Sequence, residues 1–365
     1  MNILDNVTGD NKTVVVGMSG GVDSSVAAAL LVEQGYQVIG MMLRLWSEPG
    51  RENENKCCTP DSMAQARRVA AQLGIPFYAI DVQEYFEQVI VQSFIEGYTR
   101  GITPNPCIRC NQEIRWGFLL EKALGIGADY FATGHYARIV ENGDGNVSLC
   151  RGRDQQKDQS YVLSGLSQNQ LQHTLLPLGE LTKVEVREIA RKYNFRVADR
   201  PDSQDLCFLA GEDYRTFIKR HRANEISSGK IVRRDGTIVG EHSGLFNYTI
   251  GQRRGLNISS EVPLYVIEKD IEKNVLVVGT SSELGSDELI AGKINFINQA
   301  NIENDTDYEI KIRYKAEPAL GKLFKIDNNQ LRIKFNKLLR DITPGQLVVI
   351  YNGDQVVASG EIISS

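Results

Sequence analysis

The sequence predicts an α/β protein with a doubly wound parallel sheet, followed by a small central domain and a C-terminal β-barrel. Three observations lead to this prediction. Up to about residue 200, short apolar runs alternate with longer amphipathic segments, as strands and crossover helices do in a parallel sheet. From about residue 211 the segments are short and mixed, with glycine-rich turns. From about residue 285 strand-like runs follow one another, as in a small barrel or sandwich.

These changes divide the chain into three predicted domains, at residues 1–210, 211–284 and 285–365. A chain of 365 residues with 42% hydrophobic content is long enough for one good core and at least one further domain. The sequence has no run of about 18 apolar residues, and its first residues lack the apolar segment of a targeting peptide. We therefore expect a cytoplasmic protein that has no membrane partner.

The first domain contains the most distinct element signals. We expect strands at residues 14–18, 38–43 and 76–82, and a further strand that begins near residue 129 and runs into a loop. The expected helices cover residues 27–34, 61–73, 84–98, 113–124 and 183–193, with residues 101–111 as a loop. Asp61 and Thr182 are the expected N-caps of two helices, and Gly74 the expected C-terminal stop. In the last domain, strands are expected at residues 308–316, 330–337, 346–353 and 355–362.

A glycine-serine loop is the strongest single motif. The string MSGGVDSS, residues 18–25, follows an apolar strand and opens an alanine-rich helix. Its two glycines allow a tight turn, the helix N-terminus presents unpaired N–H groups, and Ser19, Ser24 and Ser25 add hydroxyl donors. The loop therefore predicts an anion site, although a simple glycine turn with a serine cap is the alternative. It lacks the lysine of GxxxxGK[ST], which disfavours a P-loop NTPase.

The six cysteines are too few and too unevenly spaced for a disulfide scaffold. Cys110 lies in a proline-rich segment that leads into a helix, and a helix N-terminus together with Arg109 and Arg115 would favour its thiolate. Cys207 lies in a second loop. Taken singly, each cysteine is more often a small buried apolar residue than a reactive thiol.

Five strings together resemble one enzyme family. GMSGGVDS, TPNPCIRCN, ATGHYA, KDQSYVL and DSQDLCF occur in the order and approximate spacing of the tRNA-specific 2-thiouridylases of the MnmA type, from about residue 12 to the C-terminus. The first string alone resembles the pyrophosphate loop of the ATP pyrophosphatase superfamily. The resemblance implies an adenine nucleotide alpha hydrolase-like domain that uses ATP and Mg²⁺ to adenylate the C2 oxygen of a wobble uridine in tRNA. Pyrophosphate and then AMP would be released, and sulfur would come from a cysteine persulfide.

The resemblance also implies a role for particular residues. Cys110 would be the nucleophile and Cys207 the carrier of a persulfide, which a donor protein of a cysteine desulfurase relay would supply. Leu43 stands where the family often has methionine, and Cys107 where it often has aspartate. The implied ATP-binding residues are Gly17, Met18, Ser19, Gly20, Gly21, Val22, Asp23, Ser24, Leu43 and Gly134. The implied tRNA-binding residues are Asn105, Pro106, Cys107, His135, Lys157, Asp158, Gln159, Arg313, Tyr314 and Gln346.

The charge pattern is compatible with an RNA partner. The net charge of −5 does not favour one, but residues 187–234 contain 12 Lys and Arg against 7 Asp and Glu. Residues 311–340 contain 9 against 2, on strand-like sequence. Solvated surface charge is the general explanation of such runs. The second run also predicts a phosphate-binding face.

Three alternatives remain open at this stage. An iron–sulfur cluster on Cys107, Cys110 and Cys207 is possible but not favoured, and no resident metal site is predicted. The vicinal Cys57 and Cys58 are poor candidates for a metal, because such a pair rarely supplies both ligands to one ion. A lysidine-type synthetase would use an amine nucleophile and need neither cysteine. A nucleotide-binding redox sensor would use the cysteine pair as a regulatory disulfide.

Overall fold

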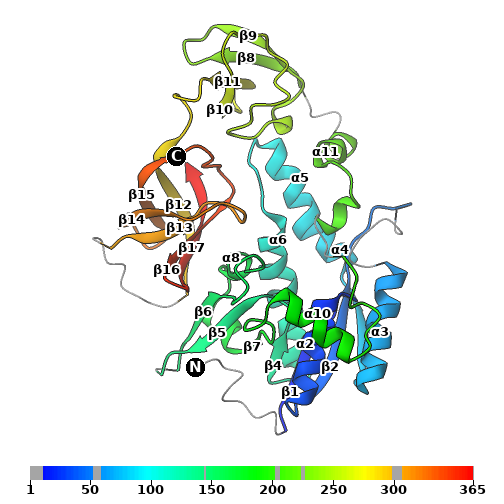
Figure 1. Cartoon of the computed structure of the whole chain (residues 1–365). Coiled ribbons are helices and arrows are strands. Elements are labelled where there is room, and N and C mark those ends of the chain that lie inside the picture. The colour runs from blue at the N-terminus through cyan, green and yellow to red at the C-terminus, as the bar shows by residue number, and fades with distance from the viewer. Residues whose placement is uncertain are drawn as a thin grey trace.

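The computed structural model describes residues 11–51, 59–143, 145–201, 206–222, 227–297 and 306–364. Its α/β part contains a five-stranded sheet in the order β3-β2-β1-β4-β7 (Figure 1). Every neighbouring pair in this sheet is parallel. The chain moves outward from β1 to β3 and then returns to the other side of β1, which is the course of a doubly wound sheet. The strands are β1 (Thr13–Gly17), β2 (Gln37–Arg44), β3 (Phe77–Asp81), β4 (Tyr130–Ala132) and β7 (Thr174–Leu175).

Two long helical runs of the α/β part have a π-helical middle. The first run comprises α4 (Gln83–Phe86), a π-helical segment (Glu87–Val91) and α5 (Gln92–Thr99). The second comprises α6 (Pro106–Arg109), a π-helical segment (Cys110–Leu119) and α7 (Leu120–Gly125). The remaining helices of the α/β part are α2 (Val22–Glu33), α3 (Pro60–Leu73), α8 (Ser160–Leu163), α9 (Gln168–Gln172) and α10 (Lys183–Lys192).

Two of the three helix ends predicted from the sequence are confirmed. Thr182 caps α10 in a capping box with Glu185, and Gly74 ends α3 in the left-handed conformation. The prediction of Asp61 as a cap is wrong. Thr59 caps α3, because its hydroxyl oxygen accepts a hydrogen bond from the N–H of Ser62, at 3.1 Å, and a proline follows at the first helical position.

A second correction concerns the segment that carries Cys110. Residues 101–111 were expected as a loop, but the helix already begins at Pro106. The side-chain oxygen of Asn105 accepts a hydrogen bond from the N–H of Ile108, at 3.4 Å, and caps this helix. Proline lacks the N–H that has no partner in a first turn, so it starts the helix here rather than breaking it. Cys107 therefore lies in the first turn, and Cys110 lies beyond it.

Small alanine side chains let α10 pack closely against α2, the helix that follows the phosphate loop. Ala27, Ala28 and Ala29 of α2 are fully buried, and α10 packs against α2. On the sheet side, Val14, Val15 and Val16 of β1 are also fully buried. This packing fixes the start of α2 relative to the end of β1 and to the start of α10.

The central part of the chain, expected as a small separate domain, combines one helix and one sheet. It consists of α11 (Tyr214–Arg222) and a four-stranded sheet in the order β10-β11-β8-β9. The core of this sheet includes Ile231, Val266, Leu276 and Val278, all fully buried. The strands are β8 (Gly229–Arg233), β9 (Ile238–His242), β10 (Tyr265–Asp270) and β11 (Val275–Gly279).

The C-terminal part is an antiparallel β-barrel, so the predicted fold class is confirmed. Its sheet order is β12-β15-β14-β13-β16-β17, and β12 also pairs with β17, which closes the barrel. The strands are β12 (Ser286–Phe296), β13 (Tyr308–Lys311), β14 (Ala319–Lys325), β15 (Gln330–Leu339), β16 (Leu347–Asn352) and β17 (Gln355–Ser364). The domain limits proposed from the sequence stay a prediction.

A hairpin that the sequence did not reveal links the α/β part to the barrel. After β4 the chain forms β5 (Ala137–Glu141) and β6 (Val147–Arg151), where a loop was expected. β6 pairs with β17 of the barrel through Cys150 and Gln355. The barrel is therefore attached directly beside the segment that follows β4. Among the described residues, no helix has the length and apolar character needed to cross a membrane.

Candidate nucleotide and thiol site

The loops that follow β1 and β4 meet at one edge of the parallel sheet. These neighbouring strands flank the point where the strand order reverses, which is where open α/β sheets bind ligands. Gly134 lies so close to α2 that a Cβ there would be 2.6 Å from the carbonyl carbon of Asp23. Gly20 has a φ of +71°, and a Cβ there would lie 2.2 Å from the carbonyl oxygen of Ser62. Both positions therefore require glycine.

The phosphate loop is shaped by its own hydrogen bonds. The hydroxyls of Ser24 and Ser25 donate to the carbonyl oxygen of Gly21, at 3.3 and 2.8 Å, and the N–H of Ser19 donates to the Ser24 hydroxyl oxygen, at 3.2 Å. Gly21 is the N-cap of α2 and has no side chain that could cap the first N–H groups. These groups and the positive end of the helix dipole are suited to bind an anion.

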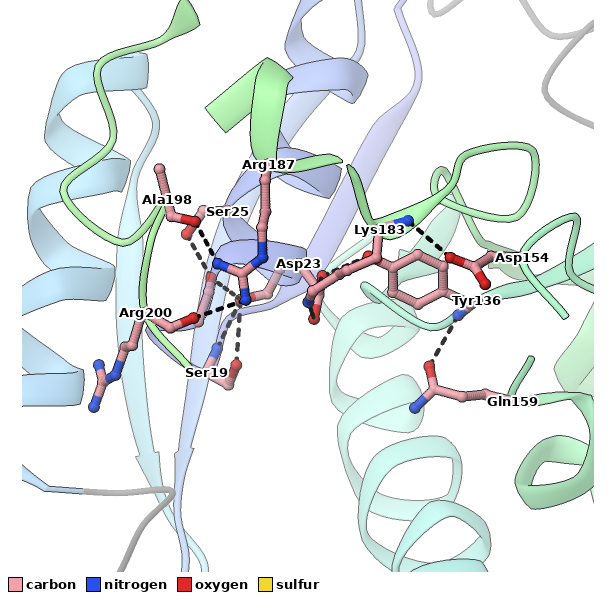
Figure 2. Close-up of polar contacts among 12 residues, drawn as sticks. Ser19, Asp23, Ser25, Tyr136, Asp154, Gln159, Lys183, Arg187, Ala198 and Arg200 are labelled. Carbon is pink, nitrogen blue, oxygen red and sulfur yellow. Dashed lines mark hydrogen bonds and ion pairs between the residues drawn. The ribbon is translucent and has the colours of Figure 1, made fainter. Parts of the chain in front are cut away.

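An ion pair that the sequence analysis missed lies at the start of α2 (Figure 2). The ammonium of Lys183 donates to both carboxylate oxygens of Asp23, at 2.7 and 2.8 Å. The hydroxyl of Tyr136 donates to the same carboxylate at 2.7 Å. Lys183 is buried, and its backbone N–H donates to Asp154 at 2.9 Å. The first residue of α10 thus brings a buried positive charge to the phosphate loop.

Arginines hold a further segment against this loop. One guanidinium nitrogen of Arg200 donates to the carbonyl oxygen of Gly20 at 3.2 Å, and another to the Ser62 hydroxyl at 3.3 Å. Arg187 of α10 donates to the carbonyl oxygens of Ala198 and Arg200, at 2.6 and 3.0 Å (Figure 2). The chain that leads toward Cys207 is therefore fixed beside the glycines. Both arginines belong to the basic run at residues 187–234, whose sequence does not indicate a contact with the phosphate loop.

The structure brings the predicted ATP-binding residues to the carboxyl ends of three strands. Gly17 ends β1, Met18 is buried just beyond it, and its N–H donates to the carbonyl oxygen of Met41 in β2. Leu43 lies near the end of β2 and packs against two apolar clusters, one around the sheet and one around Cys110. The others follow β1, begin α2 or follow β4: Ser19, Gly20, Gly21, Val22, Asp23, Ser24 and Gly134.

Both predicted catalytic cysteines contact one aromatic cluster. Cys110 is buried within it, and half-buried Cys207 packs against it from a single 3-10 turn (Cys207–Leu209). The cluster includes Phe94, Phe208 and Phe217, and the rings of Phe94 and Phe208 lie 5.1 Å apart in an edge-to-face arrangement. Two distant segments of the chain therefore place their thiols on the same apolar surface.

The other cysteines differ in position. Cys107 is exposed in the first turn of α6. Cys150 lies in β6, and burial raises the pKa of its thiol, which makes it a poor nucleophile. Cys57 and Cys58 lie outside the described residues. Within the described ranges, no three His, Cys, Asp or Glu side chains form a group that could hold a metal ion.

The loop before the cysteine helix is held by the barrel. The side-chain amide of Gln346 donates to the carbonyl oxygen of Thr103 at 2.7 Å, and the N–H of Thr103 donates to the carbonyl oxygen of Pro344 at 3.3 Å. Asn105 and Pro106, two of the residues predicted to contact the base, directly follow this contact. Gln346, predicted to bind tRNA, therefore contacts the loop that leads to Cys107.

His135 is a buried, neutral residue. Its Nδ1 lies 2.7 Å from the hydroxyl of Thr133, and its ring centroid lies 5.5 Å from that of Trp116. Burial, with a smaller effect of Arg115, lowers the pKa of His135 to about 3. The residue therefore supports the turn after β4 without carrying charge. Direct contact with tRNA stays a prediction.

Three other predicted tRNA contacts lie in the loop after β6. Asp158 accepts hydrogen bonds from the N–H of Gly152 and from the N–H and hydroxyl of Ser160, at 2.9–3.0 Å. Gln159 accepts a bond from the N–H of Tyr136 at 2.9 Å and so connects this loop to the phosphate site (Figure 2). Lys157 is half-buried in the same loop.

The last two predicted tRNA contacts lie just beyond β13. Arg313 forms an ion pair with Asp341, and the ring of Tyr314 lies 5.9 Å from that of Tyr161. A hollow on the barrel begins beside Arg313. Its lining residues are Ile312, Arg313, Lys315, Ala316, Glu317, Leu339, Arg340 and Asp341.

The chain matches three family models along its length. Residues 12–211 match the tRNA methyl transferase HUP domain, and residues 215–280 match the tRNA methyl transferase PRC-barrel domain. Residues 286–362 match the aminomethyltransferase beta-barrel domain.

Similarity to curated proteins also extends over nearly the whole chain. The tRNA-specific 2-thiouridylase MnmA of Carboxydothermus hydrogenoformans is 47% identical over 355 residues, which cover 96% of this chain and 97% of that protein. The protein of the same name from Natranaerobius thermophilus is 46% identical over 361 residues, covering 97% and 98%. That of Geotalea uraniireducens is 45% identical over 357 residues, covering 96% and 95%.

Proposed function

The chain belongs to the tRNA-specific 2-thiouridylase family, and on this premise we propose how its own residues convert a uridine of tRNA to 2-thiouridine. It is a sulfurtransferase whose α/β part belongs to the ATP-binding HUP class. The observation that carries the proposal is the shared aromatic cluster of Cys110 and Cys207, which Leu43 connects to the edge of the sheet beside the phosphate loop. Thiols and nucleotide would therefore act on one base.

The first chemical step is adenylation of the C2 oxygen of the wobble uridine. This oxygen attacks the α-phosphorus of ATP, and pyrophosphate leaves into the phosphate loop, where the α2 N–H groups and Lys183 stabilise its charge. ATP arrives with Mg²⁺. Asp23 would hold this Mg²⁺, which would help to neutralise the phosphates, and Lys183 beside it would add a second positive charge.

Sulfur transfer then uses the two thiols in turn. The terminal sulfur of a Cys207 persulfide attacks C2, and AMP leaves with the electrons of the C–O bond. The Cys110 thiolate next attacks the Cys207 sulfur and breaks the S–S bond, so the terminal sulfur remains on C2 and a Cys110–Cys207 disulfide forms. A thiol reductant restores both thiols. The persulfide comes from a donor protein of a cysteine desulfurase relay, for which half-buried Cys207 is accessible.

The tRNA would contact the exposed surface from the start of α6 to the barrel. Asn105, Pro106 and Cys107 are placed to contact the target base, and Arg313 and Tyr314 to contact the RNA near the basic strands. Arginine and lysine side chains bind the phosphates of RNA with a strong dependence on salt. The remaining candidates, His135, Lys157, Asp158, Gln159 and Gln346, lie in the segments that join these two regions.

Mass spectrometry of nucleosides tests the proposal. Unmodified tRNA is incubated with ATP, Mg²⁺, a persulfide donor and either the wild type or a Cys110→Ser or Cys207→Ser variant. We expect 2-thiouridine with the wild type only, while both variants still release pyrophosphate with tRNA. Thiolation by both variants would refute the roles of the two cysteines. Thiolation without pyrophosphate release would refute the adenylation step.

A further inference from the structure

A loop of the central part of the chain is braced by its own hydrogen bonds. The side chain of Gln252 accepts from the N–H of Thr249 at 3.1 Å and donates to the carbonyl oxygen of Arg254 at 2.9 Å. The N–H of Gly251 donates to the carbonyl oxygen of Val266 at 2.9 Å. The N–H of Val266 donates to the carbonyl oxygen of Gln252, also at 2.9 Å. The loop is thus fixed at both ends before any ligand binds.

Two arginines occupy the tip of this braced loop. Arg253 and Arg254 are both exposed, and neither guanidinium forms a hydrogen bond or ion pair with any residue that the structure describes. Two neighbouring guanidiniums on a hydrogen-bonded loop, neither of them paired with a carboxylate in the described part of the chain, make a site that attracts an external anion. The alternative is that water alone solvates the two guanidiniums. The residues that surround the loop decide between these two explanations.

The loop lies against the barrel segment that contains Arg340 and Asp341. A Cβ at Gly251 would be 3.3 Å from a carboxylate oxygen of Asp341 and 3.5 Å from the carbonyl oxygen of Arg340. Asp341 and Arg340 line the same hollow as Arg313 and Lys315. The loop that carries Arg253 and Arg254 therefore lies beside the barrel segment that contains Arg340, while the Asp341 carboxylate there pairs with Arg313.

This place is also connected to the thiol site. The barrel segment from Arg340 continues to Gln346, which binds Thr103 just before the cysteine helix. Six residue steps reach at most about 22 Å. Arg340 therefore lies within about 22 Å of the residue that binds the loop before the cysteine helix, within reach of an RNA that contacts this loop.

We propose that Arg253 and Arg254 bind backbone phosphates of the same tRNA. Together with Arg340 of the barrel they form a clamp, which here means a phosphate-binding surface shared by the central and C-terminal parts. The inference rests on the proposed function, because it takes tRNA as the ligand. Guanidiniums bind phosphate oxygens in a bidentate way, and such contacts position an RNA without reading its sequence. The clamp thus contributes to affinity for tRNA and not to the chemistry at the base.

The test measures binding of unmodified tRNA by fluorescence anisotropy over a series of KCl concentrations. In Arg253→Ala/Arg254→Ala we expect the log–log salt slope to fall by about 1.4 to 1.8, at roughly 0.7 to 0.9 for each phosphate that is no longer neutralised. Affinity should fall at least about tenfold at low salt, and KM for tRNA should rise while kcat at saturating tRNA is retained. Arg253→Lys/Arg254→Lys should retain most of the slope, because its charges remain.

A matched control is available in α3. Arg67 and Arg68 are also adjacent and exposed, and α3 lies on the side of the molecule away from β8–β11 (Figure 1). Arg67→Ala/Arg68→Ala should leave the slope unchanged. An unchanged slope in the Arg253/Arg254 variant, or an equal loss in the control, would overturn the clamp but leave the proposed function intact. A wild type without salt-dependent tRNA binding would instead contradict the proposed function itself.

Discussion

Replacing Lys183 tests the electrostatics of the phosphate loop. Lys183→Met removes the ammonium and retains an unbranched apolar stem in the same buried space. Loss of one preorganised donor to a transition-state charge costs about 3 to 4 kcal/mol, or roughly 10²–10³ in rate. The cost to stability is smaller, on the order of 1 kcal/mol, because the Asp23 side chain is 35% exposed and water can solvate its carboxylate. We therefore expect a protein that folds normally and adenylates slowly.

Single-turnover release of pyrophosphate at saturating ATP and tRNA measures this rate. Lys192→Met, at the exposed other end of the same helix, is the matched control and should release pyrophosphate at the wild-type rate. Binding of tRNA should be unchanged in both variants. A wild-type rate in Lys183→Met, or an equal loss in Lys192→Met, would refute the role assigned to this charge.

Three further predictions follow from local geometry. Gly20→Ala should abolish pyrophosphate release but retain tRNA binding, because the new Cβ would lie 2.2 Å from the Ser62 carbonyl oxygen; a normal release rate contradicts this. Cys107→Ser should retain thiolation in metal-free buffer while Cys110→Ser should not, and bound iron with a dead Cys107→Ser protein would favour a cluster instead. The folded state keeps His135 neutral with a pKa of about 3, so its burial should lower stability by about 2 kcal/mol as the pH falls from 6.5 to 5. His135→Gln should lose that part of the pH dependence in denaturation experiments at pH 7 and pH 5, and an unchanged dependence would contradict it.

The fold could be predicted because its signals are local and periodic. Apolar runs mark β1 to β3, and the capping Thr182 and the terminal Gly74 mark helix ends through contacts within a few residues. Two of the errors are also local. Thr59 rather than Asp61 caps α3, and Pro106 begins a helix where a loop was expected. In both cases the proline at the first helical position was the signal that could have corrected the prediction.

The site could be predicted only in part, because several of its contacts join segments that are distant in the chain. The glycines and serines of the phosphate loop share one string and were found together. Lys183 was missed because nothing in the sequence around α10 indicates that its ammonium reaches Asp23, which lies far away in the chain. The same holds for the β5–β6 hairpin, whose partner strand β17 is the last in the chain.

The aromatic cluster around the two thiols would exclude water from the proposed reaction. An adenylated uridine can lose AMP to water as well as to sulfur, and attack by water would restore uridine and waste ATP. Phe94, Phe208 and Phe217 are nearly or fully buried and pack edge to face in the cluster that both cysteines join, so a base that reached these thiols would lie beside side chains that offer water no hydrogen-bond partner. Because Cys110 and Cys207 belong to the same cluster, we expect disulfide formation to require movement of side chains and of the short Cys207 turn, not of whole domains. An apolar surface beside the two thiols would thus favour sulfur over water as the attacking group in the proposed reaction.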